Sequence, residues 1–577
     1  MPDYLSPGMQ LYLERLVDWD ALLKLRRGDS VDVQAEVASY RTILETAAAL
    51  AESFEAPARE NWAAPAELTP DGGARPPAHI RSAFATLREN AFLCLSASEE
   101  YGGYGLPALL SNIVIEMVSR ADASLMTLVA LQAGVANDIA KYGSEEVRRV
   151  YLPRFISGEL QGCMDISEPG AGSDVGGIRT RVTDSGDDSV RVDGQKIFIT
   201  NGGADVHLVL ARDDDSFEES KGTTQGLSLV LVPRKKEDGS ANSVRVTRLE
   251  SKLGIHGSPT CEVVFEDASG TRLGEKGNGF RAMLDLMNAA RLAVAAQAIG
   301  LSEAAFHDAV VYAHQRIQFG IPVAEQPLVK TMLAKMAVNI EGARALLYRT
   351  LVLVDLNAAR EAAAARGQCS KDQLAELERD TARVRLLTPL CKYFATEICH
   401  DLTRDAMQVL GGIGYTMEAH VAKLHADSLV TTVYEGTSEI QASFALREMG
   451  KGALAVVFSE LRDELAEFSN DPELAALAAR IEKTIELIEE TAISLFGDIT
   501  QSLLRAKLMA EMVINAIAGT ELLRQAAADA SRRDLAAAFV LRRALDTEHM
   551  GRRIRENTEG HIERASRILA QAMKAES

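Results

Sequence analysis

The sequence lacks several features that would place it in a specialised class of protein. Its 6 cysteines are scattered and never form a CxxC pair, which argues against a disulfide framework or a metal site and is typical of reduced thiols in a cytoplasmic compartment. No stretch approaches the roughly eighteen uninterrupted apolar residues of a membrane-spanning helix, so no membrane span is predicted. The amino terminus, Met1-Pro2-Asp3-Tyr4, has no basic segment followed by an apolar one, so no export signal is expected.

Basic residues are also scarce, with 62 Lys and Arg against 82 Asp and Glu and a formal net charge of -20. This surplus of acid repels nucleic acid and anionic membranes as a whole-molecule effect. Three arginine pairs near the carboxyl terminus (Arg532-Arg533, Arg542-Arg543, Arg552-Arg553) could form a local basic patch for DNA. Acidic residues are interleaved with them: Asp534, Asp546, Glu548, Glu556 and Glu559. We therefore expect a salt-bridged, solvated face and no nucleic-acid partner.

The 577 residues, 47% of them hydrophobic and 25% charged, are typical of a soluble globular protein with several domains. Helical spacing of apolar residues predicts helices within 36–155, from Gly279 to about 450, and again beyond 455. The helices expected outside the middle region include Glu36–Phe54, Ile80–Phe92, Leu109–Tyr142, Ala475–Thr491, Ser502–Ala530 and Asp534–Leu545.

Between about 160 and 270 the period changes to two, which predicts an antiparallel sheet or small barrel. The expected strands are Val190–Val192, Lys196–Thr200, Val206–Leu210, Leu227–Val232, Val244–Leu249 and Cys261–Phe265. Asp193-Gly194 and Asn201-Gly202 are turn signals and predict hairpins. The chain is thus mostly α, with a central β domain.

Two motifs carry candidate chemistry. Tyr434-Glu435-Gly436-Thr437 follows the β-prone run Leu429–Val433 and precedes a helical pattern from Ile440 to Met449. A carboxylate on a glycine-marked turn is well placed to meet a substrate, although a lone exposed glutamate is more often solvated surface. The second motif, Ile166–Asp174, is glycine-rich, so its backbone can approach a ligand closely. It lacks the third glycine of a dinucleotide-binding fingerprint.

Together these motifs resemble the acyl-CoA dehydrogenase family of flavoproteins. The resemblance covers roughly residues 36–450, and the segment Lys252–Cys261 is similar to bacterial members with a C-terminal helical extension, including 3-methylmercaptopropionyl-CoA and long-chain acyl-CoA dehydrogenases. It implies a helical N-terminal domain, an antiparallel β-barrel-like middle domain and a C-terminal four-helix bundle, plus an extra helical domain. The expected domains are an N-terminal helical arm (1–35), the helical N-terminal domain (36–158), the β domain (159–275), the helical bundle with the catalytic glutamate (276–452) and the extra helical domain (453–577).

The resemblance implies FAD as the cofactor. The residues implied to bind it are Met164, Ile166, Ser167, Gly172, Ser173, Phe198, Ile199, Thr200, Arg316, Gln318, Phe319, Gln326, Gln408, Gly411, Gly412, Thr437 and Glu439. Phe198 stands where the family has tryptophan, so it can stack on a ring but lacks the indole donor. In the family, the segments of Arg316 and Gln408 serve the FAD of a neighbouring subunit, which implies a homo-oligomer, and a dimer is favoured.

The implied reaction is α,β-dehydrogenation of an acyl-CoA to a trans-2-enoyl-CoA, with electrons passed to an electron-transfer flavoprotein. Glu435 is the expected catalytic base, because the family's alternative position is occupied by Ala290. The residues implied to bind substrate are Ser173, Asn288, Arg291, Gly436 and Arg447. His256 is more simply a structural loop residue.

Two other functions stay open at this point. An acyl-CoA oxidase would use the same base but pass electrons to oxygen, and would form peroxide quickly in air. A DNA-associated flavoprotein with little turnover would show salt-dependent binding to DNA.

Overall fold

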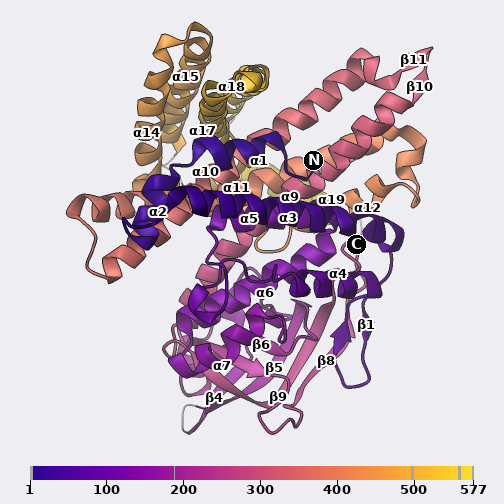
Figure 1. Cartoon of the computed structure of the whole chain (residues 1–577), viewed down its shortest axis with the longest axis vertical. Coiled ribbons are helices and arrows are strands. Elements are labelled where there is room, and N and C mark those ends of the chain that lie inside the picture. Colours follow the sequence, from indigo (N-terminus) through magenta and orange to yellow (C-terminus); the bar gives the residue numbers. More distant parts are fainter. Residues whose placement is uncertain (1–3, 187–188, 496–498, 557–559, 575–577) are drawn as a thin grey trace. The chain divides into compact units, whose positions relative to one another are not determined.

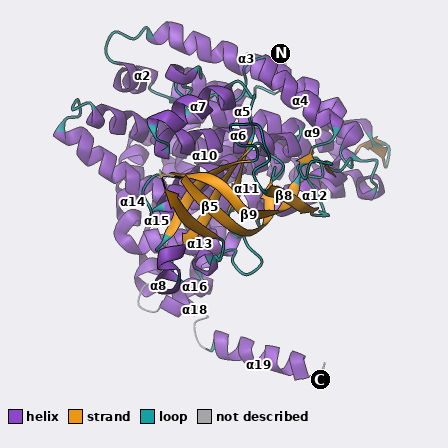
Figure 2. Ribbon diagram, turned by 90° about the horizontal axis from the view of Figure 1, so that it is seen from below, coloured by secondary structure: helices purple, strands orange, loops and turns teal. Residues whose placement is uncertain are grey.

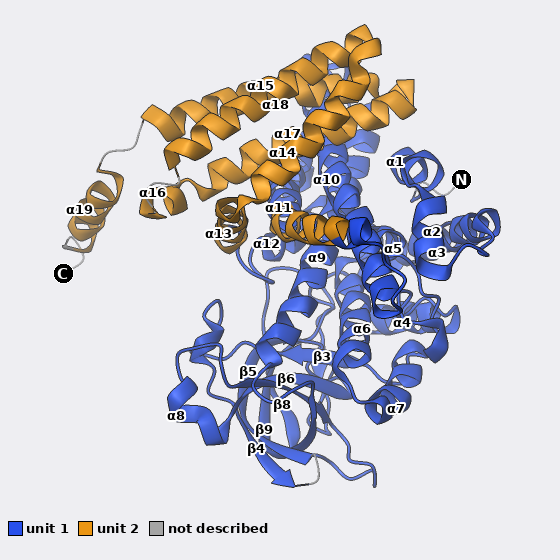
Figure 3. Ribbon diagram, turned by 90° about the vertical axis from the view of Figure 1, so that its left-hand side faces the viewer, with its two compact units in different colours: residues 1–374, 391–438 blue, residues 375–390, 439–577 orange. Residues whose placement is uncertain are grey.

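A computed structural model describes residues 4–186, 189–495, 499–556 and 560–574. The chain divides into two compact units, drawn in two colours in Figure 3: residues 1–374 with 391–438, and residues 375–390 with 439–577. Each unit is described by itself.

The first unit begins with helices, as predicted. They are α1 (Pro7–Leu11), α2 (Trp19–Arg27), α3 (Val33–Asn61), α4 (Ala78–Glu89), α5 (Ala108–Ala121), α6 (Ala123–Tyr142) and α7 (Glu145–Ile156). The long apolar stretch Leu109–Tyr142 is two helices, because Asp122 leaves the helical conformation and its carboxylate accepts a hydrogen bond from the Ser124 amide at 2.8 Å. An N-cap of this kind ends one helix and starts the next.

Helix α6 is long and apolar enough to cross a membrane by length and composition alone. In this structure 67% of its most apolar 18-residue window is buried inside the protein. Such burial is typical of the core helix of a folded domain, as the sequence predicted.

The strands of the middle region close into a ring (Figures 1 and 2). They are β3 (Gly162–Asp165), β4 (Arg181–Gly186), β5 (Ser189–Thr200), β6 (Val206–Asp213), β7 (Leu227–Pro233), β8 (Val244–Leu249) and β9 (Thr260–Leu273). The ring runs β6-β4-β5-β9-β7 and returns to β6, so the predicted small barrel is confirmed. Most pairings are antiparallel, but β3 and β4 both pair parallel to β6.

The hairpin predicted at Asp193-Gly194 is wrong. Both residues lie inside β5, where the register against β9 shifts between Val192 and Gly194. A Cβ at Gly194 would lie 2.4 Å from Thr180 Oγ1, so the glycine serves close strand packing at a bulge. Asn201-Gly202 does turn the chain, but it leads to β6, whose partners are β3, β4 and β7.

The barrel separates two apolar cores. Strand β6 shows the division, because alternate side chains of a strand point to opposite faces. Val209 lies in the core inside the barrel, whereas Leu208 and Leu210 lie in the core shared with α6, α7 and α9. Strand β3 is divided in the same way, with Cys163 in the barrel core and Met164 on the helix side.

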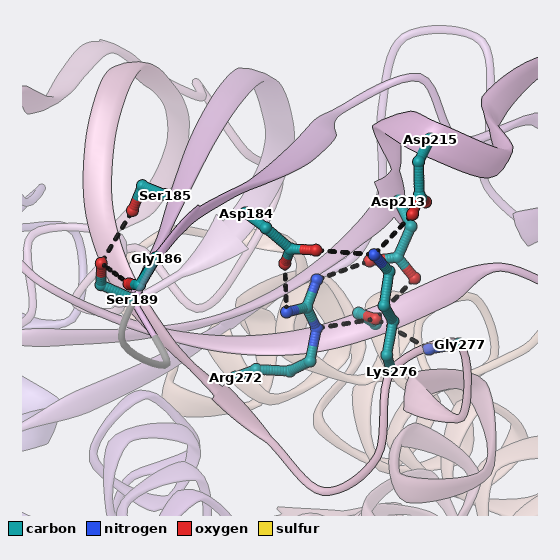
Figure 4. Close-up of polar contacts among 10 residues, drawn as sticks. Asp184, Ser185, Gly186, Ser189, Asp213, Asp215, Arg272, Lys276 and Gly277 are labelled. Atoms are coloured by element: carbon teal, nitrogen blue, oxygen red, sulfur yellow. Dashed lines mark hydrogen bonds and ion pairs between the residues drawn. The ribbon is translucent and has the colours of Figure 1, made fainter.

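Long helices follow the barrel: α9 (Gly279–Gln315), α10 (Pro327–Ala365), α11 (Lys371–Leu410) and α12 (His420–Thr431). A polar network fixes the start of α9 (Figure 4). Arg272 on β9 reaches Asp184 and Asp213, each at 2.7 Å, and Lys276 reaches Asp184 and Asp215, each at 2.7 Å. Three strands and the connection into α9 are thereby tied together.

Residues Leu429–Val433 do not form the strand that their β-branched composition favours. The helix α12 continues through Thr431, where Thr431 is fully buried and its hydroxyl donates to the Ser428 carbonyl at 2.7 Å. Packing against the unit's core outweighs a β propensity that depends on context. Short pairs β1 (Glu67–Leu68) with β2 (Ala74–Arg75) and β10 (Ile317–Gln318) with β11 (Ile321–Pro322), and the short helix α8 (Phe217–Ser220), complete this unit.

The second unit is helical, as predicted. Its elements are most of α13 (Ser438–Glu448), α14 (Leu454–Glu467), α15 (Pro472–Leu495), α16 (Ile499–Leu504), α17 (Ala506–Ala528), α18 (Arg533–Glu556) and α19 (His561–Lys574), together with 375–390 of α11. One arginine of each pair makes an ion pair, but the partners are mostly not the interleaved acids: Arg533 pairs with Asp471 and Glu473, Arg543 with Glu511, and Arg552 with the interleaved Glu556. The five domain boundaries expected from the sequence stay a prediction.

Candidate active site

The candidate base, Glu435, lies on a tight turn between α12 and α13. Its φ is 55° and that of Gly436 is 95°, so two consecutive residues are left-handed. A non-glycine residue in this region is uncommon and persists only where its surroundings hold it. The turn is held at its start, where the Tyr434 amide donates to the Val430 carbonyl at 3.1 Å, and at its end, where the Ser438 amide donates to Thr432 at 3.1 Å.

Two cations from other helices hold the turn itself. Lys392 on α11 is fully buried and donates to the Gly436 carbonyl at 2.7 Å. Arg291 on α9, 4% exposed, directs Nε at the Glu435 carbonyl at 3.5 Å and donates to Asn288 Oδ1 at 2.9 Å. Charged donors to carbonyls make strong, directional bonds, so the carboxylate of Glu435 is presented by a fixed backbone.

The flanking side chains are anchored as well. The Tyr434 hydroxyl donates to the side-chain oxygen of Gln297 on α9, and the Ser438 hydroxyl donates to Glu397 on α11. Gln297 is fully buried, and its own carbonyl accepts from Ser119 on α5 at 2.9 Å. The turn is therefore built into the helical core on both sides.

Burial raises the pKa of Glu435 above that of an ordinary glutamate, and the nearby charges of Arg291 and Lys392 oppose this rise without cancelling it. A carboxylate with a raised pKa is a stronger base. Perturbed carboxyl groups of this kind gather at functional sites.

A second candidate region lies on β3, β5 and the loop after β3. The Ile197 amide donates to the Ser167 carbonyl at 2.9 Å, which brings Ser167 next to the segment of Phe198 and Thr200. Phe198 has a positive φ of 59° and is 61% exposed. Ile199 is buried and belongs to the barrel core, so only its backbone could meet a ligand. Met164 and Ile166 are partly buried on the helix side of the barrel.

These residues offer a donor set that fits a flavin ring. Within the described parts of the chain, the hydroxyls of Ser167 and Thr200 make no hydrogen bond to protein. The exposed ring of Phe198 can stack on a planar group. Gly172 and Ser173 are exposed on the same loop, and a Cβ at Gly172 would meet nothing within 4 Å.

Sequence reasoning missed an ion pair under this loop. Lys196, fully buried, contacts Glu168 Oε1 at 2.9 Å and also donates to the Ile166 carbonyl at 2.9 Å. Glu168 accepts further bonds from the amides of Arg179 and Thr180 at 2.7 and 3.0 Å. The glutamate of the glycine-rich motif therefore anchors the loop. The sequence contained one signal for this ion pair, because Lys196 interrupts the apolar pattern of a strand.

The remaining predicted cofactor residues of this unit lie elsewhere. Arg316, Gln318 and Phe319 are exposed on the β10–β11 hairpin, with Phe319 at 94% and Gln326 partly exposed beyond it. Gln408, Gly411 and Gly412 are exposed at the end of α11. Arg316 follows Arg291 by 25 residues at the end of one continuous helix, which places it about 37 Å farther along the axis. The structure does not bring this group together with the Glu435 turn.

Three predicted site residues follow the turn. Thr437 is partly buried directly after Gly436. Glu439 and Arg447 belong to the second unit, where Glu439 is 3.2 Å from Lys507 and Arg447 lies 5.1 Å from the ring centre of Phe444. His256 lies 5.7 Å from the ring of Trp62, as a structural loop histidine would.

The chain is ordered as helices, a closed barrel and further helices, and it carries a buried carboxylate on a turn in the last helical part. This arrangement suits an enzyme that binds a planar cofactor on the barrel and a substrate among the helices. Comparisons agree: residues 39–159, 163–268 and 277–450 match the N-terminal, middle and C-terminal domains of acyl-CoA dehydrogenases. The chain belongs to the acyl-CoA dehydrogenase family, a family of FAD-dependent oxidoreductases.

Individual relatives support this assignment. The short-chain specific acyl-CoA dehydrogenase of Megasphaera elsdenii is 35% identical over 59% of this chain and 83% of its own. The 3-methylmercaptopropionyl-CoA dehydrogenase of Ruegeria pomeroyi is 33% identical over 64% of this chain, and the match spans 63% of that relative. The predicted likeness to 3-methylmercaptopropionyl-CoA dehydrogenase is thereby confirmed, and the chain has the predicted extra C-terminal helices.

Solved structures show the same fold. Butyryl-CoA dehydrogenase from Megasphaera elsdenii superposes with a TM-score of 0.58 at 28% identity, covering 70% of this chain and 96% of that one. Caenorhabditis elegans ACDH-11 in complex with C11-CoA gives 0.75 at 21% identity, covering 96% and 91%. The extra C-terminal helices are therefore shared with known structures as part of the fold.

Proposed function

We propose that this protein is an acyl-CoA dehydrogenase that oxidises an acyl-CoA thioester to its trans-2-enoyl-CoA, with Glu435 as the base. The observation that carries the proposal is the Glu435 turn, where a basic carboxylate stands on a left-handed residue held by Lys392 and Arg291. A fixed carboxylate of raised pKa can remove a proton from the carbon next to a thioester.

Different residues of the chain have different roles in this reaction. Glu435 takes the α-proton, and its backbone N–H would donate to the thioester oxygen, where negative charge develops. Ser167, Phe198 and Thr200 would hold the flavin ring of FAD. When bound, FAD supplies a hydride acceptor for the β-hydrogen. Lys392 and Arg291 act as positioning residues, because they hold the backbone on either side of the carboxylate.

Apolar side chains offer a path for the acyl group. Several partly buried apolar side chains pack against one core: Leu131 on α6, Met164 on β3, Ile166 just after β3, and Met287 and Ala290 on α9. Ala290 and Met287 lie within about one helical turn of Arg291. This places apolar surface beside the Glu435 turn, as an acyl chain requires.

The test is turnover by the purified FAD-loaded protein on acyl-CoAs of graded chain length and branching, with an artificial electron acceptor. We expect flavin bleaching without oxygen and an enoyl-CoA product for a defined range of chains. Fast peroxide formation by the reduced protein in air would instead indicate an oxidase. A protein that binds FAD but is reduced by no acyl-CoA would overturn the proposal. In the cell, we propose an electron-transfer flavoprotein as acceptor and a cytoplasmic location.

The rate of flavin reduction at saturating substrate is expected to rise with pH and to reach its plateau above the ordinary range of a glutamate. Glu435 must be ionised to act, and burial raises its pKa. Arg291→Met removes the charge that most lowers this pKa, so the midpoint should move to higher pH. Stopped-flow profiles of the two proteins measure the shift. Arg281→Met, an exposed site on the same helix, is the control. A midpoint that moved to lower pH would contradict the assignment.

Light scattering of the FAD-loaded protein is expected to give a homo-oligomer, with a dimer as the first expectation. Arg316, Phe319 and Gln408 are exposed, and Arg316 lies about 37 Å along α9 from Arg291, which contacts the Glu435 turn. A neighbouring subunit's FAD would give them a partner. Arg316→Ala should then lower FAD occupancy. A monomer with full FAD occupancy would refute this assembly.

A further inference from the structure

Three residues with metal-binding side chains, two from one strand and one from a strand about 40 residues later, meet inside the barrel. Cys163 and Asp165 lie on β3, and His207 lies beside them on β6, where the register pairs Cys163 with His207. All three are 0% exposed. The scattered cysteines gave no reason to predict a metal site. These three side chains come together only where β3 pairs with β6.

The three ligand atoms converge on one point. Cys163 Sγ lies 3.0 Å from His207 Nδ1 and 3.3 Å from Asp165 Oδ2, and His207 Nδ1 lies 3.0 Å from Asp165 Oδ2. Around tetrahedral zinc, nitrogen, oxygen and sulfur ligands at about 2.0–2.3 Å stand roughly 3.3–3.5 Å apart. The observed triangle needs only a few tenths of an ångström of expansion to hold such an ion.

Two buried polar atoms of these residues lack a hydrogen-bond partner in the part of the chain that the structure describes. Asp165 Oδ1 and His207 Nε2 are buried and make no hydrogen bond within the described residues. Groups of this kind are rare in a folded core, and each calls for an explanation. Asp165 Oδ1 belongs to the carboxylate that would hold the cation through Oδ2, and a divalent cation there would offset the buried charge of this carboxylate together with that of a Cys163 thiolate. A cation on His207 Nδ1 would leave Nε2 as it is, so only the Asp165 oxygen bears on the metal.

We propose that Cys163, Asp165 and His207 bind a divalent transition metal, with zinc as the expected ion. Thiolate, imidazole and carboxylate are the ligands that zinc prefers, and one of each gives an electrically neutral site. Cys261 on β9 lies in the same barrel core and is within electrostatic range of both Cys163 and Asp165. Its thiol is a nearby candidate for a fourth ligand.

The site would stabilise the barrel face opposite the proposed flavin. Cys163 and Asp165 point into the barrel, whereas their neighbours Met164 and Ile166 point to the helix side. The metal would therefore cross-link β3 to β6 and hold the strand whose outer face is proposed to meet FAD. Because the site is enclosed, the ion would enter as the barrel folds. The metal site itself does not depend on the proposed activity.

The test is the metal content of untagged, FAD-loaded protein, produced in zinc-supplemented medium and exchanged against a chelator. We expect one zinc per chain, with X-ray absorption at the zinc edge showing at least one sulfur among the ligands. Cys163→Ala and Asp165→Asn should each lose most of this zinc and show a lower thermal midpoint. Cys94→Ala should keep it, because Cys94 is also buried, and among the described residues its thiol donates to the carbonyls of Gln132 and Phe155.

Folded wild-type protein without stoichiometric metal would overturn the proposal, and that measurement does not depend on whether a variant folds. Zinc that persists in both Cys163→Ala and Asp165→Asn would also overturn it, since the ion would then lie elsewhere. Loss of zinc in the two variants with retention in Cys94→Ala supports it, whether or not the protein turns over acyl-CoA.

Discussion

Glu435→Gln is expected to fold, to bind FAD and to lose the reduction of its flavin by acyl-CoA by about 10²–10⁴-fold, the range usual for general acid–base catalysis. Glutamine keeps the size and the hydrogen-bonding shape of the side chain but removes its proton affinity. The contacts of Lys392 and Arg291 are to backbone carbonyls of the turn, so the substitution leaves them in place.

The loss should appear in flavin reduction itself. The β-hydrogen leaves readily as hydride only when the α-carbon gains electron density, which requires the base. Stopped-flow bleaching of oxidised flavin under anaerobic conditions measures this step before any electron acceptor is involved. Glu250→Gln is the matched control, because Glu250 is a partly buried glutamate of the same unit whose ion pair is with Arg248. Bleaching at near wild-type rate in Glu435→Gln would place the base elsewhere.

The sequence predicted the candidate base because Tyr434-Glu435-Gly436-Thr437 is a local motif. It did not predict what holds the turn, since Lys392, Gln297 and Glu397 lie on helices that precede it by about 40 residues or more. One signal was present: Lys392 interrupts an otherwise apolar helical run, and a lysine in a buried pattern needs a partner. Such partners are set by helix packing, which residue spacing within one helix does not reveal.

The barrel shows the same limit. Period-two patterns predicted most strands of the middle region, because alternation is a local property of a half-buried strand. The turn signal at Asp193-Gly194 failed because the glycine there relieves a clash with Thr180 on a neighbouring segment. The cluster of Cys163, Asp165 and His207 was equally hidden, since it exists only where β3 pairs with β6.

Lys196→Met is expected to cost about 3–5 kcal/mol of unfolding free energy, the range for removing one partner of a buried ion pair. Lys196 is fully buried, and its loss leaves Glu168 as a buried carboxylate without a cation. The Ile166 carbonyl on the proposed flavin face also loses its donor. FAD occupancy should fall with stability. Lys276→Met is the control, because its ion pairs with Asp184 and Asp215 are solvent-exposed and each is worth about 0–1 kcal/mol.

The pH dependence separates an electrostatic loss from a packing loss. In the wild type, burial alone would raise the pKa of Glu168, but Lys196 and the hydrogen bond from Thr180 outweigh it, so the pKa is lowered. The charged Glu168 therefore stabilises the fold above the pKa of an unfolded glutamate, and this contribution is lost as pH falls through the folded pKa of Glu168. Burial lowers the pKa of Lys196, so the charge of the lysine itself carries a cost that Glu168 offsets in part. In Lys196→Met, burial dominates and raises the pKa of Glu168. As the pH falls towards about 5, Glu168 becomes protonated, so the variant should recover stability relative to wild type.

The double variant Glu168→Gln, Lys196→Met buries no charge and should regain most of the loss at neutral pH. Urea unfolding of the FAD-loaded proteins at two pH values measures both effects. A loss that is equal at both pH values and persists in the double variant would show that Lys196 contributes packing and that its charge is not needed.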